Sequence, residues 1–234
     1  MSHSLVQLPF LLGTEVPPPK RPEIAAAALA ANDRYVIEFL ETHGFCPYAR
    51  SGRERGATQR RVHFADTADA SAVAQAFEDI VQGDVEVLQI IFPLIEVEAA
   101  TFSRFVYEVT EALNARQPRP VFASAALHPA LAYKSDSATG LISLFRRAPD
   151  PTLQWVRLAT LDNIYRGRKG GTSFIDPKKL GELLAAPAKR DLYDEIARNN
   201  QATAEELGLS IIETWLATLH SETQQAYRTI LATT

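Results

Sequence analysis

Residues 85–94, with the sequence Val-Glu-Val-Leu-Gln-Ile-Ile-Phe-Pro-Leu, decide the fold of this chain. The run is strongly apolar and predicts a β-strand that ends at Pro93, which cannot donate a ladder hydrogen bond. Residues 96–117 predict the clearest helix, because large apolar residues recur there at steps of three and four. Those residues are Phe102, Phe105, Val106, Val109 and Leu113.

Strands and helices alternate on both sides of this pair. Residues 60–65 and 121–127 predict two more strands, and residues 69–82 predict a helix that Gly83 closes. The order strand, helix, strand, helix, strand predicts an α/β (α+β) fold with a small central β-sheet flanked by helices. If sequential strands pair in parallel, functional loops gather at their carboxyl ends, and His128 directly follows such an end.

The remaining segments suggest three parts. Residues 1–22 form an extended amino-terminal tail, residues 23–166 the α/β core domain, and residues 167–234 a helical carboxyl-terminal extension. Further segments can be assigned by pattern: helices over residues 22–42, 138–147, 176–184, 189–199 and 204–232, a basic loop over 50–59, and helix or strand over 152–165.

Bulk properties restrict the class of protein. The 234 residues are 46% hydrophobic, enough for a sizeable core. A net charge of −4 argues against nucleic-acid binding, which usually requires a basic domain. The apolar run near the amino end has no basic region before it and predicts no signal peptide, and no run is long enough to span a membrane. We therefore expect a soluble, cytoplasmic protein without a membrane partner.

Cys46 is the only cysteine in the chain, and it cannot form an internal disulfide. Arg50 and four more arginines follow within fifteen residues, and cationic neighbours lower a thiol pKa and favour the reactive thiolate. His128, like Cys46, stands in a loop and precedes a proline. Together they would form a nucleophile and base, or two ligands of a transition metal. The structural alternative is that each is a buried residue with no chemical role.

Arginines suggest how a substrate would be held. Arg50, Arg146, Arg147 and Arg157 provide guanidinium groups of the kind that bind carboxylate or phosphate. They predict a small anionic substrate, with Arg147 at the catalytic centre and the other three in substrate binding. The alternative is that the arginine-rich segment after Cys46 is simply a solvated loop.

Three motifs in the same order resemble a bacterial family, the domain of unknown function 1415. Phe45-Cys46-Pro47-Tyr48-Ala49 is similar to its Cys-Pro-Phe-Ala signature, and His128-Pro129 resembles its His-Pro element after a strand. Residues 147–153, with Arg157 beyond, resemble its Asn-Arg-Ser-Pro-x-Pro-x-Leu-His-x-x-Arg segment. The resemblance covers about residues 33–165 and implies a shared site at Cys46, His128 and Arg147.

The chain departs from that pattern at three places. Arg146 stands where the family has asparagine, Gln154 where it has histidine, and Ala130-Leu131 where Asp-Tyr is common. The resemblance therefore implies a diverged member with its own substrate, and it implies no particular activity.

Three functions remain open. The first is a small-molecule enzyme that uses Cys46 and His128. The second is a haem- or metal-dependent oxidoreductase in which Cys46 or His128 binds the metal, because either residue type can be an axial haem ligand. The third is a non-catalytic protein that forms a homo-oligomer through the carboxyl-terminal helices, where Ile211, Trp215 and Leu219 form an apolar stripe.

Overall fold

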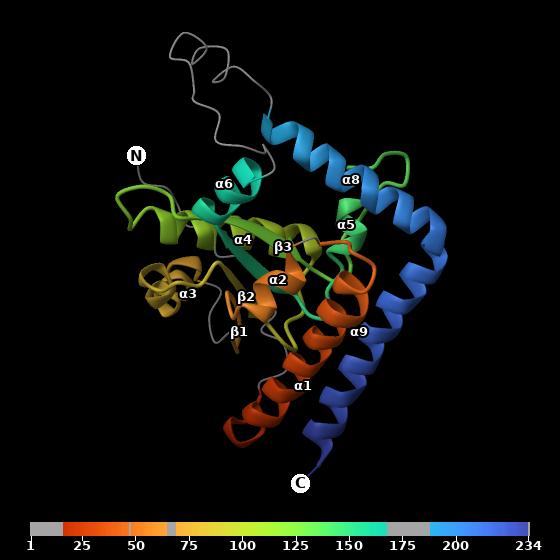
Figure 1. Ribbon diagram of the computed structural model, residues 1–234. Helices are drawn as coiled ribbons and strands as arrows, with labels where there is room; N and C mark the ends of the chain where they lie inside the picture. The colour runs from red at the N-terminus through yellow and green to blue at the C-terminus, as the bar shows by residue number, and fades with distance from the viewer. Residues whose placement is uncertain (1–15, 47, 65–68, 168–187, 234) are drawn as a thin grey trace.

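The computed structural model describes residues 16–46, 48–64, 69–167 and 188–233. It is an α/β fold in which helices flank a four-stranded mixed sheet, so the predicted fold class is confirmed (Figure 1). The predicted helix over residues 176–184 lies outside the described residues. Within the described part of the chain, no helix is both long and apolar enough to cross a membrane.

The strands are β1 (Thr58–Val62), β2 (Val87–Ile91), β3 (Phe122–Leu127) and β4 (Thr152–Arg157). The helices before β3 are η1 (Pro18–Lys20), α1 (Arg21–Arg34), the π-helix η2 (Tyr35–Glu41), α2 (Ala49–Glu54), α3 (Ala70–Ala76), η3 (Glu78–Gln82) and α4 (Ala99–Asn114). After β3 come α5 (Ile142–Phe145), α6 (Leu158–Gly167), α8 (Ala188–Leu207) and α9 (Leu209–Ala232).

The sheet has the order β1-β2-β4-β3. β1 and β2 are parallel, and β4 runs antiparallel to both of its neighbours, β2 and β3. Sequential parallel pairing therefore holds for β1 and β2 but not for β2 and β3, because β4 inserts between them. The segment 152–165, which the pattern left as helix or strand, is a strand that becomes helix α6 at Leu158.

All five residues of β2 are buried, and the alternation of a strand sends them to two different cores. Leu88 and Ile90 join a cluster built with α3 and α4, which includes Trp155 of β4. The indole Nε1–H of Trp155 donates to the hydroxyl of Thr110 on α4 over 2.8 Å, so the one polar atom of this side chain is satisfied. The apolar face of α4 therefore packs where its sequence periodicity predicted.

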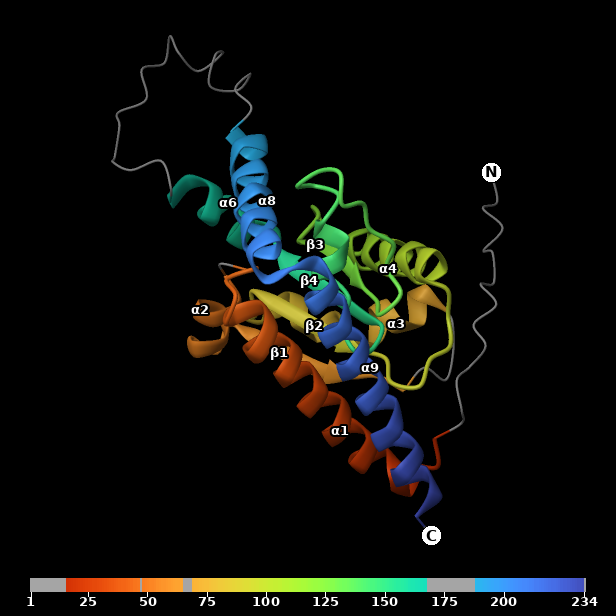
Figure 2. The same ribbon diagram turned by 90° about the vertical axis from the view of Figure 1, so that its right-hand side faces the viewer.

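The opposite face of β2 is covered by α1 and α9, which lie side by side in both views (Figures 1 and 2). Ile91 packs there with Ala28 of α1 and with Tyr227 of α9. Arg34 and Glu222 join the same two helices at the surface through a contact of 2.7 Å. α9 thus covers one face of the sheet, although it lies more than fifty residues beyond β4 in the sequence.

Local chemistry explains the start of α3 and the turn after η2, and two of the expected elements need correction. Asp69 caps α3 by accepting from the Ser71 N–H over 2.8 Å, and Gly44 follows η2 with a φ of 70°. The segment 50–59, expected as a loop, contains most of α2 and the start of β1. The helix expected over 204–232 is two helices, because Gly208 interrupts it with a φ of 87°.

Candidate functional site

Cys46 lies in the loop between η2 and α2, as the sequence predicted, and its neighbours hold that loop in place. The ring of Phe45 stacks on the ring of Phe145 with centroids 4.3 Å apart. The side-chain amide of Asn200 on α8 donates to the Phe45 carbonyl over 3.0 Å. Contacts from α5 and α8 therefore anchor the loop, and within it Cys46 is half-buried.

The surroundings of Cys46 act on its thiol in opposite directions. Burial raises the pKa of the thiol most, whereas the Ala49 N–H, by hydrogen bonding, lowers it. The negative charge of Glu41 raises the same pKa, and the positive charge of Arg146 lowers it. The net result is a raised thiol pKa, which differs from the expectation that the arginine-rich flank would lower it.

Burial is the largest cause of this difference, and the arginines of that flank are in addition largely occupied by carboxylates. Arg53 binds Glu41, Arg55 binds Glu86, Arg60 binds Asp33 and Arg61 binds Asp79. Each pair cancels much of the field that the arginine alone would exert on the thiol. Counting arginines in the sequence therefore overstated the positive charge at Cys46.

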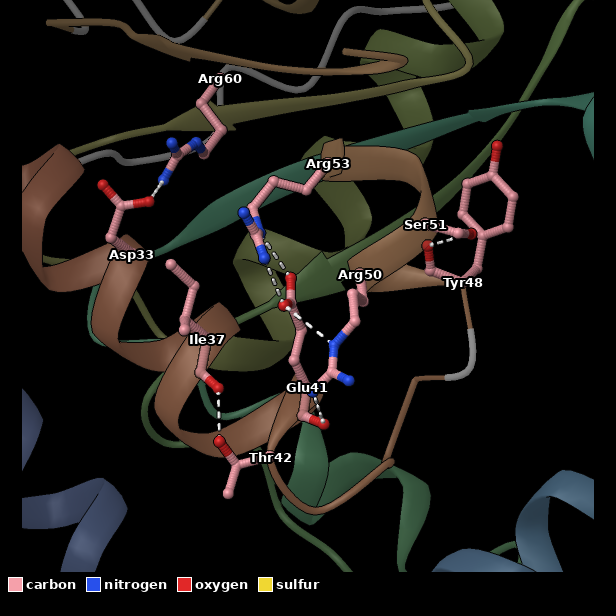
Figure 3. A network of polar contacts seen from close by, with 9 residues as sticks. All are labelled: Asp33, Ile37, Glu41, Thr42, Tyr48, Arg50, Ser51, Arg53 and Arg60. Carbon is pink, nitrogen blue, oxygen red and sulfur yellow. Dashed lines mark hydrogen bonds and ion pairs between the residues drawn. The ribbon is translucent and has the colours of Figure 1, made fainter. Parts of the chain in front are cut away.

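Figure 3 shows how α2 and η2 are joined through Glu41. Arg53 donates two hydrogen bonds of 2.8 Å to the two carboxylate oxygens of Glu41, whose side chain is only 2% exposed. These bonds lower the Glu41 pKa, so the carboxylate is held in its charged form. Arg50 contacts the same group loosely, with its Nε 3.8 Å from a carboxylate oxygen, and its side chain is 62% exposed. Arg50 therefore remains accessible for another anion.

Arg146 is the exposed cation beside Cys46. It follows α5, and its carbonyl accepts hydrogen bonds from the His128 and Ala148 N–H groups. Within the described residues its guanidinium has no carboxylate partner, in contrast to the arginines of the flank. The backbone of Arg146 is thus fixed while its charged group is available to a ligand.

His128 is held by the backbone at both ring nitrogens. Its Nδ1 accepts from the Ala130 N–H over 3.1 Å, and its Nε2–H donates to the Val97 carbonyl over 3.0 Å. Burial lowers the pKa of the ring, which packs on Phe102. The imidazole is therefore neutral and saturated, and it would have to break a backbone hydrogen bond to serve as a base or metal ligand.

The other two arginines serve the fold. Arg147 donates to the Leu131 carbonyl over 2.7 Å and lies 3.6 Å from a carboxylate oxygen of Glu213 on α9. Arg157 donates to four backbone carbonyls around the turn between η3 and β2 and lies over the Phe122 ring. Cys46, Arg50 and Arg146 thus lie around one loop, whereas the guanidinium groups of Arg147 and Arg157 are committed elsewhere.

Two residues near Cys46 were missed by sequence reasoning. Tyr35 and Glu41 both lie in η2, where the pattern indicated only an apolar helical face. The charge of a Cys46 thiolate would act on Tyr35, whose pKa is raised mainly by burial and whose hydroxyl donates to the Phe145 carbonyl over 2.6 Å. For Glu41, the one indication in the sequence was a charged residue on the apolar side of a predicted helix.

Comparison with known proteins gives no relative: no family model, no curated protein and no solved structure matches this chain. The resemblance to the domain of unknown function 1415 therefore stays a prediction. The haem or metal alternative also stays a prediction. Among the residues that the structure describes, no three His, Cys, Asp or Glu side chains are grouped as metal ligands would be. If the alternative holds, the purified protein is coloured or carries stoichiometric metal, and Cys46→Ala removes it.

Arg157→Met tests whether Arg157 supports the fold. Four carbonyls lose their donor, so we expect the free energy of unfolding to fall by about 2–3 kcal/mol. Urea denaturation followed by circular dichroism measures this. The control is the exposed Arg119→Met, which should leave the midpoint within error. Equal midpoints for both variants would contradict the structural role.

Proposed function

We propose that this protein is an enzyme that acts on a small anionic molecule, with Cys46 as the reacting thiol and Arg146 and Arg50 binding the anion. The observation that carries the proposal is the unpaired guanidinium of Arg146 beside a half-buried thiol, within the described residues. An exposed guanidinium suits carboxylate or phosphate, since its planar N–H groups can bind two oxygens at once.

Arg50 supports the proposal by its position and freedom. It extends from α2, four residues beyond Cys46, and Glu41 already receives both of its strong hydrogen bonds from Arg53. Arg50 therefore loses only weak contacts when it turns toward a ligand. His128 is left out of the proposal, because both of its ring nitrogens are used by the backbone.

The raised thiol pKa sets the pH dependence that this enzyme would show. Only the thiolate is nucleophilic, so its fraction and the rate rise with pH until the raised pKa is passed. A thiolate of higher pKa is intrinsically the stronger nucleophile, which offsets part of its low population at neutral pH. Arg146 increases the thiolate fraction and attracts the substrate with the same charge.

Alkylation with two reagents of similar shape tests the anion site directly. Iodoacetate is anionic and iodoacetamide is neutral, so the ratio of their rates at Cys46 reports the local positive charge. We expect Arg146→Gln to lower the ratio of the iodoacetate rate to the iodoacetamide rate by about 3- to 10-fold at low salt. The pH at which either reagent reaches half of its maximal rate should also rise, because the thiolate loses a stabilising positive charge. Mass spectrometry of the single labelled cysteine gives the rates.

The matched control is Arg147→Gln, the adjacent arginine, whose guanidinium is committed to Leu131 and Glu213. It should leave the ratio unchanged. Cys46→Ala should fold normally and take up no label. An unchanged ratio in Arg146→Gln, or an equal loss in both variants, would rule out the anion site.

The surface of α9 favours a second candidate function, assembly of a homo-oligomer. Of the predicted apolar stripe, Leu219 is buried, Trp215 stacks on Phe39 with centroids 5.2 Å apart, and only Ile211 is exposed, at 66%. Ile211 borders an open, mainly apolar hollow of about 420 Å³, lined also by Ser210, Thr214, Trp215 and Thr218. The exposed Ile211 side chain beside this hollow is the part of α9 that a second copy of the chain would contact.

If α9 forms an interface, Ile211→Asp lowers the molar mass in solution, because a carboxylate would be buried without a partner. Light scattering coupled to size exclusion measures this. Tyr107→Asp, at an exposed aromatic residue on α4, is the control that should keep the mass of the parent. A monomeric parent protein would contradict this candidate.

A further inference from the structure

Asp150 is a buried carboxyl group that the proposed chemistry does not use. It lies just before β4, and only 1% of the residue is exposed. Its Oδ2 accepts a hydrogen bond of 2.6 Å from the Tyr227 hydroxyl on α9, while its Oδ1 is buried with no hydrogen-bond partner among the described residues. One short hydrogen bond therefore joins α9 to the segment that directly precedes β4.

The surroundings of Asp150 disfavour a negative charge. Tyr227 packs in an apolar cluster with Ile24 and Ala28 of α1 and with Ile91 of β2. An ionised carboxylate accepts several hydrogen bonds, and the Tyr227 hydroxyl is the one donor found for it in the described parts of the chain. Burial accordingly raises the Asp150 pKa from 3.8 to about 7, and the Tyr227 hydrogen bond opposes this.

Among the described residues, no lysine, arginine or histidine side chain is paired with the Asp150 carboxyl group. α9 contributes His220, whose Nδ1–H donates to the Pro149 carbonyl over 2.7 Å, and β3 ends beside the neutral His128. α1 and β2 contribute the uncharged Asn32 and Gln89, which are buried and themselves keep amide atoms without partners in the described residues. This side of the sheet thus already holds unsatisfied polar atoms, and a charge there is costly.

We propose that the contact between Asp150 and Tyr227 is a pH-sensitive switch: it holds α9 against α1 and the sheet while Asp150 keeps its proton, and α9 loosens and admits water when that proton is lost. An opened α9 exposes Asp150 to solvent, where the carboxyl ionises normally. The proposal is independent of Cys46 and of the proposed function.

The direction of the pH effect follows from the two states of this carboxyl. Below pH 3.8 it is protonated in both the closed and the open state, so pH has no effect through this group. Between pH 3.8 and about 7 only the open state loses the proton, so opening increases with pH, by up to about tenfold per pH unit. Above about pH 7 both states are ionised and the effect is constant.

Infrared titration of the whole protein tests the protonation. We expect the carbonyl stretch of a protonated carboxylic acid to persist to about pH 7 in the parent protein and to be absent in Asp150→Asn. Tyr227→Phe should move its loss to higher pH, because the hydroxyl that favours the charged form is gone. Loss of the band in the range of ordinary aspartates would overturn the proposal.

Hydrogen exchange tests the loosening of α9. Protection factors of the α9 amides should fall between pH 4 and 7 in the parent and in Asp84→Asn, an exposed aspartate control, but stay level in Asp150→Asn. The same slope in all three proteins would overturn the switch. If Asp150→Asn fails to fold, hydrogen exchange of the parent still decides the switch, because α9 protection factors that stay level between pH 4 and 7 would overturn it.

Discussion

The burial of β2 on both faces is the constraint on which the rest of the structure depends. A strand with five buried residues requires a helical layer on each side, because neither row of its side chains can face water. α3 and α4 provide one layer from neighbouring sequence. The other is built from the two ends of the chain, α1 and α9, and this explains why residues so distant in sequence share a cluster around Ile91.

Within these layers, many polar side chains are bound to the backbone or to one another. His128, Arg147 and Arg157 all donate to main-chain carbonyls, and the amide of Gln89 donates to the Gln154 carbonyl oxygen over 3.0 Å, directly across β2 and β4. Such contacts fix the register of a sheet, since a shift by one residue would bury these groups without partners. Residue types that suggest catalysis therefore serve here to align and close the fold.

At the candidate site, residue types in the sequence predicted position better than they predicted charge. The sequence placed Cys46 in a loop after a helix that ends at Gly44, and that position is confirmed. It also placed arginines nearby, but their charge at the thiol depends on which carboxylates they meet. Asp33 of α1, Glu41 of η2, Asp79 of η3 and Glu86, just before β2, neutralise most of them. Arg146, a hundred residues away, is left as the exposed cation beside Cys46.

The sequence by itself determined the α/β class, the strand and helix centred on residues 85–117 and the loop that carries Cys46, because periodicity, glycine and proline act locally. Only the tertiary structure decided that β4 inserts between β2 and β3, that α9 covers the sheet, and that burial outweighs the arginines at Cys46. The reason is physical. Strand order, ion-pair partners and desolvation depend on contacts between distant segments, and no local pattern of residues encodes them.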